Sequence, residues 1–242
     1  MRVLDFSFAE PDRNLALDEV LLDAVEAGDS DDVLRFWESP VPFVVLGVSQ
    51  VLHDHVWADV CRAEGVRVQR RCSAGGCVLQ GPGSLNFALA LRYSSDPAYP
   101  SLRGSYCRIL ELVGKALATA GCSVTPQGVS DLAEGERKVS GNAQKRRKYA
   151  FLHHGTLLYR VNAAGMTRYL KEPEDRPAYR GGRTHESFLT ALPLQPEVIK
   201  SALAARFCPG AVTGTRLEDT LLEATNLLVD EKYSRQDWIH RR

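Results

Sequence analysis

The order of the strand-like and helix-like segments restricts the fold of this chain more than any other feature of its sequence. Segments rich in β-branched and aromatic residues fill the middle of the 242 residues, and amphipathic helical patterns lie near both ends. The regular alternation of strand and helix that builds a doubly wound parallel sheet is missing. The pattern therefore predicts an α+β fold in which a mixed, mostly antiparallel central sheet is flanked by helices.

Hydrophobic periodicity and turn residues give the approximate bounds of these elements. Helices are predicted over residues 12–27, 56–64, 102–120, 166–171, 185–191, 196–207 and 217–229. Strands are predicted over residues 33–38, 42–48, 66–69, 85–93, 122–125 and 138–159, the last broken by turns. Because only a Ser-Pro turn separates the first two strands, they are expected to form a hairpin-like unit.

No Pro-, Gly- and Ser-rich linker divides the chain, so residues 1–242 are predicted to form one domain. Thirty Lys and Arg residues balance thirty Asp and Glu residues, which gives no overall field that would attract nucleic acid or an anionic membrane. Neither is therefore predicted as a partner.

The chain begins with acidic residues, Asp5, Glu10 and Asp12, where a secretory signal needs an apolar run. No later stretch approaches the ~18 apolar residues of a membrane span. Six cysteines lack any CxxC spacing, as expected for reduced thiols. These features predict a cytoplasmic protein.

A glycine-rich segment over residues 70–86, RRCSAGGCVLQGPGSLN, is the first with a chemical pattern. Its glycines let the backbone approach a ligand and offer amide donors, and Arg70 and Arg71 add positive charge. This combination suits a phosphate or carboxylate, although the spacing matches neither a P-loop nor the GxGxxG of a dinucleotide fold. The alternative is a hairpin turn with surface arginines, and composition alone does not decide between them.

The second segment, residues 130–144, places Lys138 at the start of a strand, after Asp131 and before small residues. A lysine there can set its ammonium against a phosphate, and Asp131 can lie near a metal ion. The alternative is a solvated lysine after an acidic turn. The small residues Ser140, Gly141 and Ala143 weaken that alternative, because they leave room for a ligand beside the strand.

Two adjacent histidines, His153 and His154, lie in the third segment, a predicted strand. Neighbouring residues of a strand point to opposite faces, so the pair does not ligate one zinc ion from this element. One is expected to face a cavity and the other to be a hydrogen-bonded structural residue. No carboxylate or serine partner is apparent in the sequence, which disfavours a catalytic dyad.

Two further segments are basic. Residues 179–188 place arginines around a Gly pair before Thr184, a predicted helix cap, and suit either a loop that closes over an anion or a plain loop-to-helix junction. Residues 145–148, KRRK, are predicted to be a polar hairpin tip, with contact to an acidic partner surface as the alternative.

In this order, the motifs resemble the lipoate-protein ligase A family, whose biotin and lipoate ligase fold is related to class II aminoacyl-tRNA synthetases. The resemblance covers nearly the whole chain and rests on NLALDE at 14–19, RFWE at 35–38, LGVSQ at 46–50, RRCSAGG at 70–76, GSLNF at 83–87, Asp131 with RKVSGNAQ at 137–144, and HGTLL at 154–158.

The resemblance implies a catalytic Lys138 that touches both an acyl carbonyl and the α-phosphate of ATP, with Mg²⁺ as a cofactor at Asp131. It also implies that lipoate or octanoate is activated as an acyl-adenylate and transferred to a lysine of a lipoyl-domain protein, E2 or H-protein-like. The lipoyl- and adenylate-binding residues implied are Arg70, Arg71, Ser73, Gly75, Gly76, Cys77, Val78, Asn86, Asp131, Ser140, Gly141, Asn142, Ala143, His154, Gly155 and Thr156.

The sequence departs from the family pattern at three places. Ala74 stands where the family loop has glycine, which implies a different loop shape or strain if that position needs a positive φ. Ser130 stands where the family often has Asn, beside the expected adenine contacts. The chain ends soon after Trp238, which resembles the end of the catalytic domain, so a C-terminal accessory domain is expected to be absent and a separate accessory subunit remains an open alternative.

Three other functions are consistent with the same segments. An octanoyl or lipoyl transferase of this fold acts through a cysteine thioester without ATP, and Cys72 and Cys77 lie in the glycine-rich segment. The transferases carry their cysteine beyond the HGxL strand, however, where this chain has only Cys208. A non-catalytic lipoyl-binding subunit is the second alternative. A biotin ligase is disfavoured, because the loop reads SAGG instead of a GRGRxG-like run.

Overall fold

The computed structural model describes residues 1–172 and 177–241 and confirms the predicted α+β architecture. Within these residues, the larger sheet has the spatial order β11 (Thr213–Gly214), β1 (Arg2–Asp5), β2 (Val33–Trp37), β6 (Ser84–Arg92), β10 (Ala150–Leu158), β9 (Arg137–Arg146), β8 (Asp131–Glu134) and β7 (Thr125–Gln127). Strand β1 is parallel to its two neighbours, and the other adjacent pairs are antiparallel. The sheet is therefore mixed and mostly antiparallel, as predicted.

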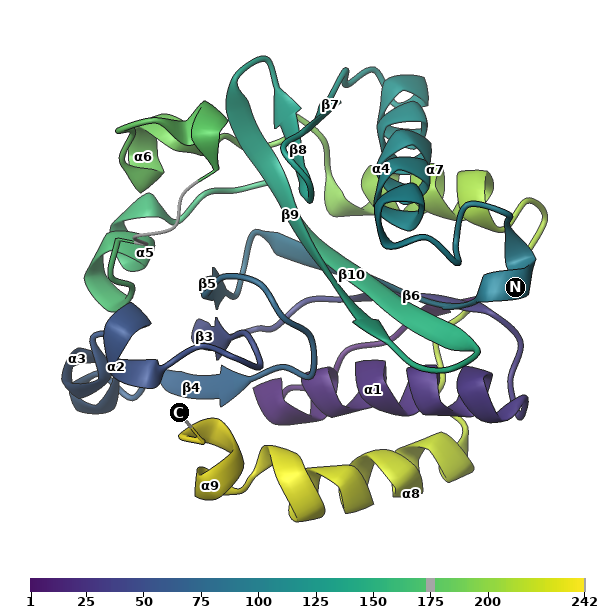
Figure 1. Cartoon of the computed structure of the whole chain (residues 1–242), viewed down its shortest axis with the longest axis horizontal. Helices are drawn as coiled ribbons and strands as arrows, with labels where there is room; N and C mark the ends of the chain where they lie inside the picture. The colour runs from purple at the N-terminus through teal and green to yellow at the C-terminus, as the bar shows by residue number, and fades with distance from the viewer. Residues whose placement is uncertain (173–176, 242) are drawn as a thin grey trace.

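A smaller sheet stands beside the larger one (Figure 1). Its order is β4 (Arg67–Arg70), β3 (Phe43–Leu46) and β5 (Val78–Gln80), with β3 parallel to β4 and antiparallel to β5. The predicted hairpin of residues 33–38 and 42–48 is wrong, because β2 and β3 belong to different sheets. Strand β2 pairs with β1 on one side and β6 on the other, so it has no free edge for β3.

The seven predicted helices form, with bounds that shift by a few residues, and the described residues contain two further short helices, Leu52–His55 and Gln236–Ile239, that were not predicted. In chain order, the helices are α1 (Pro11–Ala27), α2 (Leu52–His55), α3 (Ala58–Ala63), α4 (Leu102–Thr119), α5 (Ala163–Tyr169), α6 (His185–Phe188), α7 (Pro196–Phe207), α8 (Asp219–Leu228) and α9 (Gln236–Ile239). Short helical turns lie at η1 (Tyr93–Ser95), η2 (Ala178–Arg180) and η3 (Val229–Tyr233). Helix α1 begins with Pro11 and ends at Ala27, and the φ of 86° at the following Gly28 allows its amide to cap the last turn.

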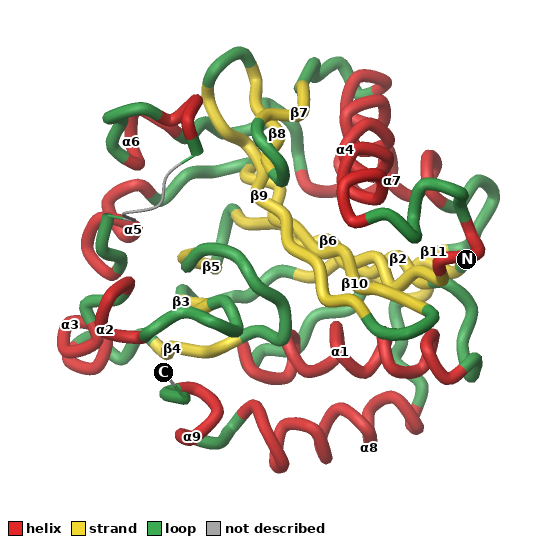
Figure 2. Tube along the Cα trace, viewed as in Figure 1, coloured by secondary structure: helices red, strands yellow, loops and turns green. Residues whose placement is uncertain are grey.

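Helices cover both faces of the larger sheet (Figures 1 and 2). On one face, α4 and α7 contribute Val113 and Leu203 to a core that includes Phe87 and Phe151. On the other face, α1 packs against the sheet and α8 packs outside α1. No helix among the described residues is long and apolar enough to cross a membrane.

Candidate functional site

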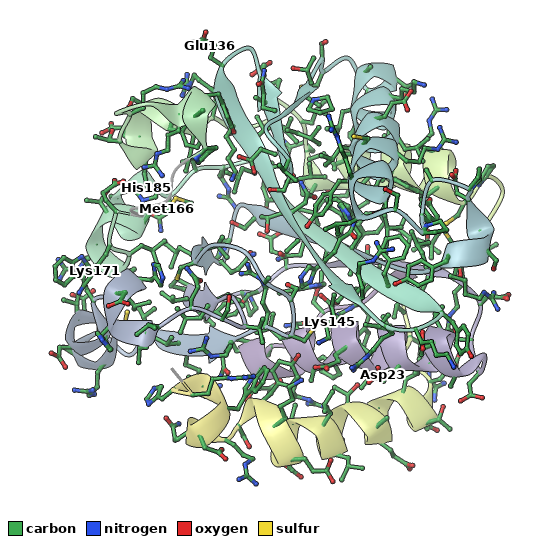
Figure 3. The ribbon with its side chains drawn as sticks, viewed as in Figure 1. Asp23, Glu136, Lys145, Met166, Lys171 and His185 are labelled. Carbon is green, nitrogen blue, oxygen red and sulfur yellow. The ribbon has the colours of Figure 1, made fainter. Side chains whose placement is uncertain are left out.

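A cavity of about 950 Å³ lies between the two sheets, with α1 at one end and α5 and α6 at another side. In Figure 3, Met166, His185 and Lys171 mark that side, and all three line the cavity. Most of the predicted binding residues also line it, namely Arg71, Gly75, Gly76, Cys77, Val78, Asn86, Asp131, Lys138, Gly141, Asn142, Ala143, His154, Gly155 and Thr156. Segments that are far apart in the sequence therefore meet around one space.

The strand register aligns five cavity-lining residues in one row across the larger sheet. Asp131 pairs with Gly141, Gly141 with Thr156, Thr156 with Asn86, and Asn86 with Trp37. At about 4.8 Å per strand, the part of the row from β9 to β2 spans roughly 14 Å. The larger sheet forms the floor of the cavity, and the row therefore runs along the length of this floor.

A β-bulge turns Lys138 toward this row. Leu132 and Ala133 are adjacent on β8, but they pair with Ser140 and Lys138 on β9, so Val139 is an extra residue. The bulge reverses the alternation of side chains beyond that point, and Val139 stays in the core while Lys138 shares the face of Gly141. A Cβ placed on Gly141 would lie 2.9 Å from Lys138 Nζ, so the ammonium lies directly over this glycine.

Asp131 holds the Lys138 ammonium in place. Its Oδ1 lies 2.8 Å from Lys138 Nζ, and its Oδ2 accepts a hydrogen bond of 2.7 Å from the Tyr179 hydroxyl. Burial and the neighbouring carboxylate raise the pKa of Tyr179, so the phenol stays protonated and remains a donor. Segment 179–188 reaches the cavity through Arg180, His185 and Phe188, which line it, and Thr184 caps α6 as predicted.

Arg71 is a buried cation that organises the glycine-rich loop. Its Nε donates to Ser73 Oγ at 3.0 Å, and its Nη2 donates to the carbonyl oxygens of Ala74 and Gly76 at 2.7 and 2.9 Å. No acidic side chain among the described residues forms an ion pair with it, and burial lowers its pKa. Because a counter-charge stabilises a buried charge, the charge of Arg71 is suited to an anion in this part of the cavity.

In the glycine-rich loop, glycine occupies the position at which the backbone has a positive φ. Gly75 has a φ of 95°, whereas no described non-glycine residue has a positive φ, so the alanine at position 74 carries no such strain. A Cβ on Gly47 would lie 2.1 Å from the carbonyl oxygen of Gly75. The close contact between these two glycines therefore fixes how near the glycine-rich loop lies to the residue that follows β3.

The structure does not bring Arg70 to the cavity. The side chain is fully buried and donates to the carbonyl oxygens of Gly47, Gln50 and Ile239 at 2.7 to 3.0 Å. Its own carbonyl accepts from the Trp238 indole at 3.0 Å. Successive strand residues point to opposite sides, so Arg71 faces the cavity while Arg70 joins the loop to α9.

His153 and His154 point to opposite faces, as predicted. His153 is fully buried, and burial lowers its pKa to about 3, so it is a neutral structural residue. His154 lines the cavity, where its Nε2 lies 2.6 Å from Ser73 Oγ and its Nδ1 lies 3.4 Å from Asp18 Oδ2. These partners, which the sequence did not reveal, join α1 to the loop through His154.

Ser73 and Ser140 do not line the cavity. Ser73 lies behind the loop between Arg71 and His154, and Ser140 is buried with its hydroxyl accepting from Asn142 at 3.1 Å. Their interactions support residues that do line it.

Leu15, Asp18, Trp37 and Gln80 are among the cavity-lining residues that the sequence interpretation missed. Asp18 had a detectable signal, because it is an acidic residue on the apolar face of the α1 pattern. It forms a buried ion pair with Arg35 at 2.6 Å. Gln80 had no comparable signal in a glycine-rich stretch.

The basic segment 145–148 is a hairpin tip, as predicted, and it packs onto α1. Arg147 forms ion pairs with Glu19 and Asp23, and Glu26 accepts hydrogen bonds from the backbone amides of residues 148–150. Of the four basic side chains of the tip, Arg147 is therefore paired with acidic residues of α1.

Comparison with known proteins matches residues 10–202 to the lipoyl protein ligase A/B catalytic domain. The chain is 27% identical over 240 residues to lipoate-protein ligase A subunit 1 of Thermoplasma acidophilum, covering 93% of this chain and 90% of the relative. It is also 24% identical over 276 residues to the octanoyltransferase LipM of Moorella thermoacetica, covering 100% and 98%.

Two solved structures have the same fold. One is a bi-partite lipoate protein ligase studied with its E2 lipoyl domain from Thermoplasma acidophilum, with a TM-score of 0.82, 22% identity, and coverage of 99% of this chain and 96% of that chain. The other is a lipoate-protein ligase A bound with ATP, with a TM-score of 0.82, 24% identity, and coverage of 99% and 98%.

Proposed function

Because the chain belongs to the lipoyl protein ligase A/B catalytic domain family, we propose that it is an ATP-dependent lipoate-protein ligase. It forms lipoyl-adenylate and then transfers the lipoyl group to a lysine of a lipoyl-domain protein. The observation that carries the proposal is the Lys138 ammonium, which the bulge aims into the cavity at one end of the cross-strand row.

In the first step, a carboxylate oxygen of lipoate attacks the α-phosphorus of ATP. A carboxylate–phosphorus bond forms, the bond to the bridging oxygen breaks, and pyrophosphate leaves with the electron pair. Lys138 and Arg71 offset the repulsion between the two anions and the charge that develops in the transition state. The nearby loop amides add further donors.

Mg²⁺ fits as a partner of the triphosphate. Asp131 is a hard oxygen ligand at the Lys138 end of the row, and Mg²⁺ commonly uses one carboxylate together with substrate phosphates. No group of three or more metal-binding side chains occurs in the described residues, so the phosphates would supply most of the remaining ligands. When bound, the ion would neutralise phosphate charge.

The cross-strand row has the length that an acyl chain of eight carbons requires. Seven carbon–carbon bonds of about 1.5 Å extend over at most roughly 10 Å, which fits within the roughly 14 Å from β9 to β2. The chain would run from Lys138 toward Trp37 and Leu15, which are apolar wall residues at the α1 end. Octanoate fits the same row as an alternative substrate.

The ligase is favoured over a thioester-forming transferase by the state of the cysteines. Among the cysteines that the structure describes, only Cys77 lines the cavity. Burial raises the pKa of both Cys72 and Cys77 to about 12. A thioester route needs the thiolate, which such a pKa makes rare at neutral pH. The transferase remains the second candidate, since one full-length relative is the octanoyltransferase LipM.

Cys77→Ser is therefore expected to leave ATP-dependent lipoylation within about threefold of the unaltered protein, because the thiol is not the nucleophile. Mass spectrometry of an E2 lipoyl domain incubated with enzyme, ATP and lipoate measures the product. Loss of all acyl transfer in this variant would support the transferase instead.

Gly47→Ala is expected to displace the carbonyl of Gly75 and with it the glycine-rich loop. A shift of about 1 Å can cost roughly 10²-fold, so kcat/KM for lipoate should fall by about that factor. Gly214→Ala is the control, because the nearest atom to its new Cβ is at an ordinary 3.5 Å. Equal kinetics in the two variants would contradict the role given to the loop.

The proposal includes the partners and the place of the reaction. The acceptor is a lysine of an E2 or H-protein-like lipoyl domain, and the relation to a ligase subunit raises an accessory subunit as a further partner.

We place the reaction in the cytoplasm, where ATP is available and the free thiols of the chain stay reduced. Residues 1–242 act in it as one catalytic unit. Lipoate-dependent exchange of pyrophosphate into ATP tests the activity.

A further inference from the structure

Three polar side chains on the floor and wall of the cavity form a closed ring of hydrogen bonds. Gln80 Nε2 donates to Thr156 Oγ1 at 2.7 Å, Thr156 Oγ1 donates to Asn86 Oδ1 at 3.0 Å, and Asn86 Nδ2 donates to Gln80 Oε1 at 3.1 Å. The residues come from β5, β10 and β6, and all three line the cavity. A polar ring is unexpected in a pocket for an acyl chain.

Counting donors leaves one hydrogen without a partner. Asn86 Nδ2 uses its second hydrogen on the carbonyl of Ser84 at 3.2 Å, and the Thr156 hydroxyl hydrogen is used within the ring. Gln80 Nε2 carries two hydrogens, and only the one toward Thr156 meets an acceptor among the described residues. Gln80 is 7% exposed, and a buried donor without a partner is unfavourable. The site therefore has a donor that a ligand acceptor would satisfy.

The ring also fixes which way the Gln80 amide points. If the amide were turned over, its Nε2 would face the Nδ2 of Asn86, and two donors would oppose each other. The observed orientation instead gives each ring member one donor and one acceptor. The free amide hydrogen is therefore held in place before any ligand binds, as electrostatic stabilisation of a transition state requires.

The position of the ring relates it to Lys138. Gln80 Nε2 contacts Thr156 Oγ1, Thr156 pairs directly with Gly141, and the Lys138 ammonium lies over Gly141, so the two donors lie over adjacent strands, β10 and β9. Gln80 bridges Thr156 and Asn86, so it follows the Lys138 end of the cross-strand row directly. Gln80 thus offers a neutral donor beside the cationic one.

We infer that Gln80 is a catalytic residue that donates its free amide hydrogen to the acyl carbonyl oxygen, opposite the Lys138 ammonium. The inference rests on the proposed ligase function. In acyl transfer, the acceptor lysine nitrogen attacks the carbonyl carbon and the carbonyl electron pair moves onto oxygen. Gln80 and Lys138 stabilise that oxyanion, the bond to AMP then breaks, AMP leaves with the pair, and the nitrogen releases one proton to water.

Gln80→Leu tests the inference in a single-turnover transfer from preformed lipoyl-adenylate to an unmodified E2 lipoyl domain. Removal of one oxyanion donor should lower the transfer rate by about 10²-fold. Gln69→Leu is the matched control, since Gln69 is equally buried at 5% exposure but does not line the cavity. Its transfer rate should remain that of the unaltered protein.

Thermal unfolding of each variant separates catalysis from stability. If Gln80→Leu does not fold, Gln80→Met, whose unbranched chain keeps a similar shape, should show the same loss of rate. A Gln80 variant that folds and transfers at the unaltered rate overturns the inference and leaves the ligase intact. Failure of the unaltered protein to transfer from lipoyl-adenylate would instead overturn the proposed function.

Discussion

Lys138→Ala is expected to abolish lipoate-dependent adenylate formation while the fold remains intact. The ammonium is the cation that the bulge at Val139 directs over the row, and removal of such a group should lower the exchange rate by at least about 10³-fold. Stability should change little, because the Lys138 side chain is 25% exposed and partly exposed ion pairs contribute roughly 0–1 kcal/mol.

A matched control for this variant exists in the same chain. Lys200 forms an ion pair with Asp5 at 2.9 Å and has a side chain 26% exposed, but it does not line the cavity. Lys200→Ala should therefore exchange pyrophosphate at the unaltered rate. Comparable activity in Lys138→Ala and Lys200→Ala would refute the role of Lys138.

Arg35→Leu is expected to cause the largest loss of stability among these variants. Arg35 is fully buried and Asp18 is 1% exposed, with Arg35 Nη1 and Asp18 Oδ1 2.6 Å apart. Removing the cation leaves a buried carboxylate without its partner, and it also frees the carbonyl of Asn14 to which Arg35 donates. Breaking a buried pair from one side costs about 3–5 kcal/mol.

Denaturant unfolding measures this loss as a change in the free energy of unfolding. Arg62→Leu is the control, since Arg62 pairs with Asp59 in a fully exposed position and should change stability by less than about 1 kcal/mol. Similar effects of the two substitutions would show that the Arg35–Asp18 pair is not a main support of the α1 wall of the cavity.

Local pattern was sufficient for the elements whose signals are local. The helix at Pro196–Phe207 was predicted with its observed bounds, and the bounds of α1 and α4 differed by one residue. Periodicity and capping residues determine these helices, so no distant contact was needed. The hairpin of residues 33–38 and 42–48 failed because strand pairing depends on distant partners, here β1 and β6.

The cavity shows the same division between local and distant information. The glycine-rich loop and the Lys138 segment were found from motifs, but their shared cavity depends on strand register. Alternation continued from β4 (Arg67–Arg70) to the next residue places Arg70 and Arg71 on opposite faces, so they cannot both line the cavity. By contrast, the Asp18–His154 contact joins residues 136 positions apart, and the bulge at Val139 depends on how β9 pairs with β8.

The most direct test of the account is the exchange of radiolabelled pyrophosphate into ATP by the purified chain. The account predicts exchange that depends on lipoate, is lost in Lys138→Ala and persists in Cys77→Ser. Absence of exchange, together with acyl transfer that needs no ATP and is lost in Cys77→Ser, would contradict it.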